Sequence, residues 1–297
     1  MGPLYQNHTP AKMQDMMTIA EIKKNILTSP VVTPVVLRPH ASHRGAGQLS
    51  HHQHSQVLNM NSPNVVLPDN SHTGEKEKFR ELTMDELRNF RLKKASVLVP
   101  LLLTGGELYV LLTKRSMKVR SHKGQVALPG GAFDVTCDRT DVDTALRETE
   151  EEVGLMAEKV EVIGQLTPLI SAAGYLVTPI IAIIQEFKPL LNRDEVEDVF
   201  YLPLRRFLSN DRHHHSQSTS YKIPLHYFTD TVDGKEFNTW GLTALICIAM
   251  AMIVYQKQTD FVVDDDIKVT LENPTAVHDA MLSYMNEEES KVVSSKL

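Results

Sequence analysis

The sequence predicts an α+β domain in which a mixed β-sheet is sandwiched by helices. Apolar runs of strand length outnumber helical segments, and the two kinds do not alternate regularly, a pattern typical of mixed sheets with helices packed on them. The composition is that of a globular protein, with 42% hydrophobic and 23% charged residues. The 297 residues are enough for one domain with extensions or for two small domains.

The first 78 residues are predicted to form a disordered extension outside this domain. They are rich in His, Ser, Pro and Asn, contain few aromatic residues and show no sustained hydrophobic period. Order is expected to begin at the capping box Thr83-Met84-Asp85-Glu86, which predicts a helix through about residue 91.

The body of the predicted domain, residues 83–260, combines strands with two helices. Residues 96–103 and 108–113 are β-compatible runs, and the intervening Thr104-Gly105-Gly106-Glu107 predicts a hairpin turn. Further strands are predicted at 160–166, 177–185, 199–202 and 223–228, and helices at 142–153 and 240–256. Residues 261–297 are expected to form a peripheral tail with a short helix near 275–286.

Charge and cysteine content disfavour several classes of function. The chain has 37 acidic residues and 31 Lys and Arg, and its net charge of −6 disfavours general nucleic-acid binding. Two cysteines, Cys137 and Cys247, cannot provide a disulfide framework or a Cys-based zinc site. The most apolar run, 242–254, is shorter than the ~20 residues that cross a bilayer, so no membrane span is expected.

The last three residues, Ser295, Lys296 and Leu297, match a known address signal. Ser-Lys-Leu is the C-terminal tripeptide read by the peroxisomal import receptor, and the polar residues before it would leave it accessible. We therefore expect this receptor as a partner and the peroxisome as the location; the alternative is a chance tail.

The densest chemistry lies on the helix at 142–153. Its sequence from Arg147 reads Arg-Glu-Thr-Glu-Glu-Glu-Val-Gly-Leu, which places Glu148, Glu151 and Glu152 at i, i+3 and i+4 on one face, aimed away from the core. These like charges repel one another, and the helix dipole disfavours anions at this end. Such an oxygen-rich cluster suits a hard cation such as Mg²⁺ or Mn²⁺. The alternative is a solvated charged face.

The loop before this helix strengthens the metal interpretation. Leu128-Pro129-Gly130-Gly131 lets the backbone turn tightly and approach a ligand. Together with the acidic run it resembles the signature of the Nudix hydrolases. The first half departs from that signature: Arg139 stands where an early Glu belongs, the loop is longer, and either Asp134 or Asp138 replaces the Glu.

A second motif lies just upstream. Leu-Leu-Thr-Lys-Arg-Ser at 111–116 is followed by Arg120, Gly124 and the Gly-Gly loop, and it resembles the coenzyme A branch of the Nudix family, with Leu128 in place of Phe. The side chains of Arg115 and Arg120 could hold phosphate oxygens, as guanidinium groups do. The alternative is a solvated basic strand end or a partner for the acidic helix.

The resemblance implies metal-dependent hydrolysis of coenzyme A or its thioesters, giving 3′,5′-ADP and the 4′-phosphopantetheine part. Glu148 and Glu152 would bind Mg²⁺ or Mn²⁺, Glu151 would add a ligand or orient Arg147, and the Gly130-Gly131 region would position the diphosphate. The general base would be Glu151, Glu152 or Glu195. The alternatives are a hydrolase of another nucleotide diphosphate, such as NADH or ADP-ribose, and a non-catalytic module that binds acyl-coenzyme A.

Overall fold

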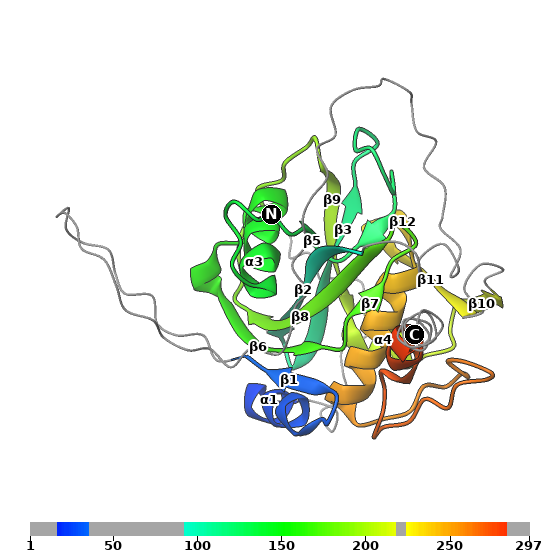
Figure 1. Cartoon of the computed structure of the whole chain (residues 1–297). Helices are drawn as coiled ribbons and strands as arrows, with labels where there is room; N and C mark the ends of the chain where they lie inside the picture. Colours follow the sequence, from blue (N-terminus) through cyan, green and yellow to red (C-terminus); the bar gives the residue numbers. More distant parts are fainter. Residues whose placement is uncertain (1–16, 36–91, 218–223, 284–297) are drawn as a thin grey trace, which may run out of the picture. The chain divides into compact units, whose positions relative to one another are not determined.

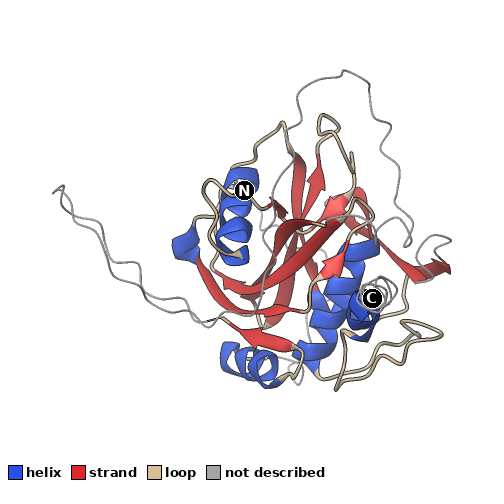
Figure 2. Cartoon of the chain, viewed as in Figure 1, coloured by secondary structure: helices blue, strands red, loops and turns tan. Residues whose placement is uncertain are grey.

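The computed structural model describes residues 17–35, 92–217 and 224–283. In these ranges the strands form one nine-stranded mixed sheet and one three-stranded sheet (Figures 1 and 2). The central strands β8 and β2 of the large sheet run parallel, while its other paired strands are antiparallel. The predicted mixed sheet with helices is therefore confirmed.

The large sheet has the order β1-β6-β8-β2-β3-β4, with β5 paired to β2, β7 to β8 and β9 to β3. Its strands are β1 (Val32–Pro34), β2 (Lys93–Thr104), β3 (Glu107–Arg115), β4 (Val126–Ala127), β5 (Gly130–Ala132), β6 (Val160–Leu166), β7 (Leu169–Ile170), β8 (Tyr175–Ile184) and β9 (Val196–Pro203). The second sheet contains β10 (His213–Gln217), β11 (Pro224–Val232) and β12 (Lys235–Trp240). The predicted hairpin is β2 and β3, and the prediction of 160–166 coincides with β6.

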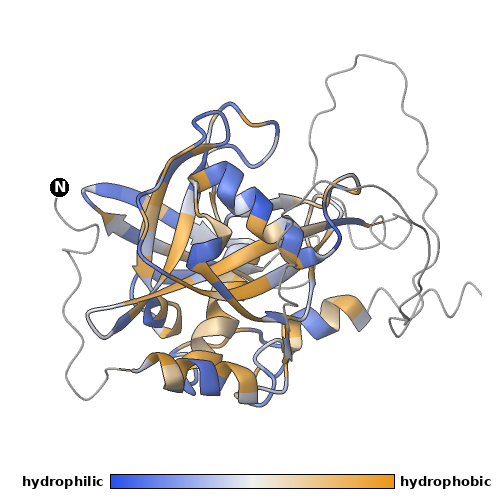
Figure 3. Ribbon diagram, turned by 90° about the vertical axis from the view of Figure 1, so that its left-hand side faces the viewer, coloured by the Kyte–Doolittle hydropathy of each residue, from blue (hydrophilic) through white to orange (hydrophobic). Residues whose placement is uncertain are grey.

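The central strands are buried on both faces because each face carries a hydrophobic cluster. On β2, Leu98 and Leu102 pack with the helix α3 (Asp141–Val153), whereas Val99 and Leu101 pack in the cluster that contains α4 (Gly241–Tyr255). This alternation follows from the two-residue repeat of a strand. Figure 3 shows largely hydrophobic strands beneath a helix that carries hydrophilic residues. The sheet therefore holds α3 and α4 on opposite faces (Figure 1).

The two predicted helices form within one residue of their expected limits. A capping box joins Thr140 and Asp143 at the start of α3, and Gly154 ends this helix with a φ of 72°. The apolar run predicted as a helix at 240–256 is α4, which is almost wholly buried. Of the helices described, none combines the length and apolar character needed to traverse a bilayer.

The predicted disordered extension of residues 1–78 is wrong for residues 17–35. Here a second capping box, formed by Thr18 and Glu21, opens α1 (Ile19–Thr28), and β1 then pairs antiparallel with β6. Ile22 and Ile26 of α1 are fully buried in the cluster that contains α4. Their spacing of four residues is helical and was the signal available in the sequence. The remainder of 1–78 lies outside the described residues.

The peripheral position predicted for residues 261–297 is wrong for the described part, although the short helix predicted near 275–286 is present. Val263, Val277 and Met281 are buried in the same cluster as α4, and residues 276–283 are helical up to the last residue described. The domain therefore extends beyond the predicted limits of 83–260. The helix predicted at 83–91 and the tripeptide at 295–297 lie outside the described residues.

Candidate active site

Glu152 lies in the last turn of α3 and faces the sheet rather than solvent. Only 3% of this residue is exposed, and its Oε2 accepts a hydrogen bond from the backbone N–H of Gly130 at 3.2 Å. Its Oε1 lies 3.6 Å from Nη1 of Arg115 at the end of β3. The expectation that the acidic face points away from the core is therefore wrong for Glu152.

The two glycines of the loop allow the sheet to approach these carboxylates closely. A Cβ on Gly131 would lie 2.4 Å from Cδ and Oε2 of Glu148. Gly130 has a φ of 149°, and a Cβ there would lie 2.3 Å from the backbone oxygen of Ser96. Either contact is shorter than van der Waals packing permits. The Gly-Gly pair thus brings β5 against α3 at the position of Glu148 and Glu152.

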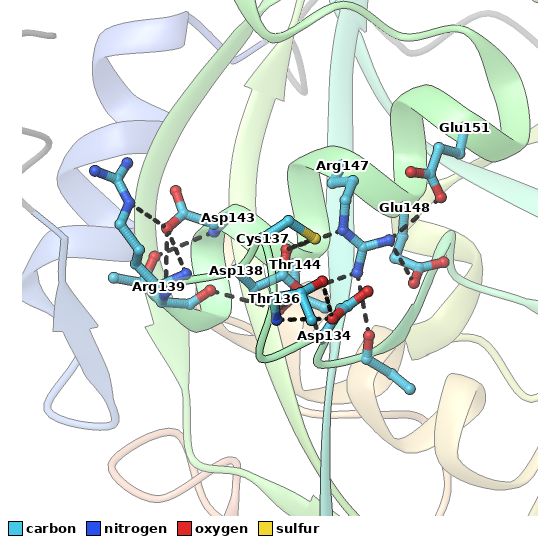
Figure 4. Close-up of polar contacts among 12 residues, drawn as sticks. Asp134, Thr136, Cys137, Asp138, Arg139, Asp143, Thr144, Arg147, Glu148 and Glu151 are labelled. Carbon is cyan, nitrogen blue, oxygen red and sulfur yellow. Dashed lines mark hydrogen bonds and ion pairs between the residues drawn. The ribbon is translucent and has the colours of Figure 1, made fainter.

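Arg147 is the centre of a polar network that joins α3 to the loop before it (Figure 4). Its Nε and Nη2 donate to the two carboxylate oxygens of Asp138 at 2.9 and 2.8 Å. Its Nη1 donates to Glu148 at 2.9 Å and to Glu151 at 3.2 Å. The hydrogen bonds from Arg147 hold the pKa of Asp138 well below its usual range. Arg147 therefore fixes the positions of two of the predicted metal ligands.

The structure distinguishes the two candidate acids of the loop. Asp138 is buried and also accepts hydrogen bonds from the Thr144 hydroxyl and from the backbone N–H of Asp134, both at 2.9 Å. The carboxylate of Asp134 instead accepts from the backbone and hydroxyl of Thr136 (Figure 4). Of the two loop acids, Asp138 is therefore the one that pairs with the arginine of α3. Thr144 was not identified from the sequence, where no periodic signal marks it.

Glu195 reaches the same region through a loop that docks on the end of α3. The backbone N–H groups of Leu190 and Asn192 donate to the carbonyls of Val153 and Glu152 at 2.9 and 3.0 Å. The N–H of Ser116, just after β3, donates to the carbonyl of Glu195 at 2.8 Å. Glu195 is half-buried, and its charge acts on both Glu148 and Glu152. The third candidate base therefore lies near enough to the other two carboxylates for its charge to act on them.

Burial and mutual repulsion make this group of carboxylates electrostatically unfavourable. Burial raises the pKa of Glu152 to about 8, and the charges of Glu148 and Glu195 act in the same direction. Burial also raises the pKa of Glu148, with contributions from Glu151 and Glu195. A cation placed among these oxygens would relieve both effects.

The donor set fits a hard divalent cation. Carboxylate oxygens are the ligands that Mg²⁺ and Mn²⁺ favour, and Glu148 and Glu152 are held one helical turn apart by α3. Within the described ranges, no three His, Cys, Asp or Glu side chains are already gathered as a metal-binding group. In this structure Arg147 engages Glu148 and Glu151, and Arg115 lies beside Glu152.

The two predicted phosphate-binding arginines differ in their positions. Arg115 is largely buried at the end of β3 beside Glu152. Arg120 is exposed in the loop between β3 and β4. The structure therefore brings Arg115 beside Glu152, which also contacts Gly130 of the Gly-Gly loop. Arg120 lies on the surface, five residues further along the chain.

Comparison with known proteins identifies relatives of this chain. Residues 92–222 match the family described as NUDIX domain. Nudix hydrolase 15, mitochondrial, from Arabidopsis thaliana is 39% identical over 198 residues, covering 65% of this chain and 69% of that protein. Peroxisomal coenzyme A diphosphatase NUDT7 from Mus musculus is 36% identical over 179 residues, covering 59% and 75%. The uncharacterized Nudix hydrolase NudL of Escherichia coli strain K12 is 37% identical over 192 residues, covering 59% and 96%.

Solved structures also resemble part of the chain. An Ap4A hydrolase from C. elegans in a binary complex matches at 20% identity with a TM-score of 0.33, covering 38% of this chain and 81% of that one. The Nudix hydrolase RenU from M. smegmatis matches at 22% identity with a TM-score of 0.35, covering 43% and 81%.

Proposed function

Since this chain belongs to the Nudix hydrolase family, we propose that it hydrolyses the diphosphate bond of coenzyme A and its thioesters. The products would be 3′,5′-ADP and 4′-phosphopantetheine or its acyl derivative. One structural relationship supports this substrate class: Arg115 of the upstream motif lies 3.6 Å from Glu152 of the signature helix. The two motifs thus meet in one site, and a mouse relative with 36% identity is a coenzyme A diphosphatase.

Glu148 and Glu152 would hold the divalent ion, with Glu151 as a further ligand or as the partner that orients Arg147. When bound, Mg²⁺ or Mn²⁺ neutralises phosphate charge and acidifies a water molecule. The Gly130-Gly131 segment would position the diphosphate, because its backbone passes directly beside both carboxylates. Arg115 would contact the diphosphate oxygens, and Arg120 would reach a phosphate from the adjacent loop.

Glu195 is the general base that the geometry favours. The Glu152 carboxylate is buried against Gly130 and Arg115, and the Glu151 carboxylate is paired with Arg147. Glu195 is half-buried, and its position is held by the end of β3 and the loop on α3. It would accept the proton of the attacking water as the oxygen attacks phosphorus and the bridging P–O bond breaks.

The test is incubation with coenzyme A and Mg²⁺, followed by chromatography for 3′,5′-ADP. Glu152→Gln should reduce the rate by at least about 100-fold, since one oxygen-anion ligand is removed without a change in shape. Glu150→Gln is the matched control, because Glu150 lies on the same helix but is exposed. Absence of product from the wild-type protein, or full activity of Glu152→Gln, would contradict the proposal.

Competing substrates test the specificity separately. NADH and ADP-ribose should be hydrolysed more slowly than coenzyme A at equal enzyme concentration. A clear preference for NADH or ADP-ribose would contradict coenzyme A as the substrate but would leave the proposed hydrolase reaction in place. No turnover of any of them, with binding of acyl-coenzyme A, would indicate a non-catalytic module.

We propose the peroxisome as the site of this activity, with the import receptor binding Ser295-Lys296-Leu297 as a C-terminal signal. The mouse relative is peroxisomal, whereas the Arabidopsis relative is mitochondrial. A fluorescent protein fused before residue 1 should accumulate in peroxisomes, and Leu297→Glu should abolish this. Mitochondrial accumulation, or no effect of the substitution, would contradict it.

A further inference from the structure

The ion pair between Arg115 and Glu152 leaves both side chains with unused binding capacity. The separation of 3.6 Å between Nη1 and Oε1 is an ion-pair distance but too long for a hydrogen bond. The Nε atom of Arg115 is buried and makes no hydrogen bond within the described part of the chain. The other oxygen of the Glu152 carboxylate, Oε2, accepts a hydrogen bond from the backbone N–H of Gly130.

Each member of this pair has a stronger partner available in the proposed reaction. A guanidinium group binds most tightly when two parallel N–H groups meet two oxygens, as on phosphate. A buried carboxylate needs close compensation of its charge, and Arg115 at this distance leaves the pKa of Glu152 raised. A divalent ion would satisfy Glu152, and a diphosphate would satisfy Arg115.

Building on the proposed function, we propose that Arg115 is an exchangeable counter-ion for Glu152. In the metal-free site Arg115 holds the carboxylate of Glu152. When a divalent ion takes this carboxylate, the guanidinium of Arg115 turns to the substrate diphosphate. Arg115 then takes part in both metal binding and diphosphate binding. Each of these two events lowers the free-energy cost of the other, because each releases the ion pair that opposes the other.

The consequence is a coupling between metal and substrate that passes through Arg115. Coupling between two ligands is reciprocal, so a diphosphate that engages Arg115 must raise the affinity of Glu152 for the metal by the same factor. The metal and the diphosphate also attract each other directly, and this part of the coupling does not need Arg115. Arg115 is therefore expected to contribute to the factor by which the diphosphate raises metal affinity. This contribution is separate from its effect on the affinity for the metal alone or for the diphosphate alone.

The experiment measures this coupling without turnover. The dissociation constant of Mn²⁺ is determined by electron paramagnetic resonance, with and without a saturating concentration of the methylene analogue of ADP. Both constants are measured at one pH and are calculated from the concentration of free Mn²⁺. The analogue carries a diphosphate that cannot be hydrolysed. In Arg115→Gln the ratio of the two constants should fall by about tenfold relative to the wild type.

Two further variants separate charge from geometry. Arg115→Lys keeps the charge but loses the two-pronged donor, so its ratio should lie between those of the wild type and Arg115→Gln. Lys114→Gln removes the same charge one residue away, where Lys114 pairs with Glu197 at 2.8 Å, and should leave the ratio unchanged.

Three results would overturn the proposal. If both Mn²⁺ constants of Arg115→Gln shift by the same factor, so that their ratio equals that of the wild type, Arg115 is a partner of Glu152 alone. If neither Mn²⁺ constant changes, Arg115 is at most a phosphate contact. If the ratio in Lys114→Gln were as low as that in Arg115→Gln, the coupling would depend on the total positive charge of this region and not on Arg115 itself. Because the assay uses neither coenzyme A nor turnover, it can succeed even if the proposed substrate is wrong.

Discussion

Asp138 and Arg147 face each other through two parallel contacts, from Nε to Oδ1 at 2.9 Å and from Nη2 to Oδ2 at 2.8 Å. The carboxylate is buried, and the guanidinium also reaches Glu148 and Glu151. The lengthened loop therefore positions side chains of α3, because its Asp138 holds Arg147, and Arg147 holds the carboxylates of Glu148 and Glu151.

Asp138→Asn should reduce both stability and activity. The substitution removes the charge that compensates Arg147, at a cost of about 2–3 kcal/mol for a largely buried pair. Activity should fall at least about tenfold, because Glu148 and Glu151 lose a fixed partner. Denaturant unfolding and initial rates check this. Asp134→Asn is the control, since Asp134 is exposed and should change stability by less than about 1 kcal/mol.

Gly131→Ala should impair the site through a direct clash. The new methyl group would lie 2.4 Å from the carboxyl group of Glu148, so either the helix or this side chain must shift. We expect at least a tenfold loss of kcat and weaker Mn²⁺ binding. Gly105→Ala provides the comparison, because its Cβ would meet open space. It should cost only about 1 kcal/mol through its positive φ, with activity retained. Equal activity of both variants would argue against the clash.

The metal-free protein should lose stability, relative to Glu152→Gln, as the pH rises from about 4.5 to 8. The pKa of Glu152 is raised to about 8 in the folded state, so between these pH values its carboxyl group ionises in the unfolded chain but not in the folded one. This ionisation favours the unfolded state and lowers the stability of the fold. The difference should reach about 5 kcal/mol and level off above pH 8. Denaturant unfolding of both proteins in chelator measures it. Saturating Mg²⁺ should remove the difference, and a difference independent of pH would contradict the assignment.

His278 should make the fold sensitive to acid. Burial lowers its pKa to about 4, while the unfolded side chain titrates near its usual value of 6.5. Its stabilising contribution is therefore present at neutral pH and is lost as the pH falls from about 6.5 to 4, by about 2 kcal/mol at pH 5. His278→Gln keeps a donor near the Thr167 carbonyl but does not titrate. A pH dependence in this variant equal to that of the wild type would refute the prediction.

Ile26→Ala should destabilise the whole domain although it lies far along the chain from the site. Ile26 is fully buried in the cluster with α4, so its truncation should cost about 2–4 kcal/mol. Leu27→Ala, at an exposed neighbour, should cost less than about 0.5 kcal/mol. Both proteins should retain the wild-type kcat. A small effect of Ile26→Ala on denaturant unfolding would show that α1 is not part of the cooperative unit.

The strands and helices with a clear hydrophobic period were predictable. The hairpin of β2 and β3, the strand β6 and the helices α3 and α4 follow from patterns of local residues. The helix α1 was missed because ten residues are too few to be stable alone, and packing of Ile22 and Ile26 supplies its stability. The packing of residues 261–283 was missed for a related reason: up to residue 275 their apolar side chains lie on irregular backbone, where no hydrophobic period marks them as core.

The sequence by itself determined the family, because two motifs at nearly fixed spacing bring together the carboxylates of α3, the Gly-Gly loop and Arg115. Only the tertiary structure decided which partners these residues have: Asp138 rather than Asp134 binds Arg147, and Glu152 is buried against Gly130 and Arg115. The physical reason is that motif spacing specifies neighbours along one helix or strand. Burial and ion pairing depend instead on where the sheet, the helix and a loop without periodicity meet in space.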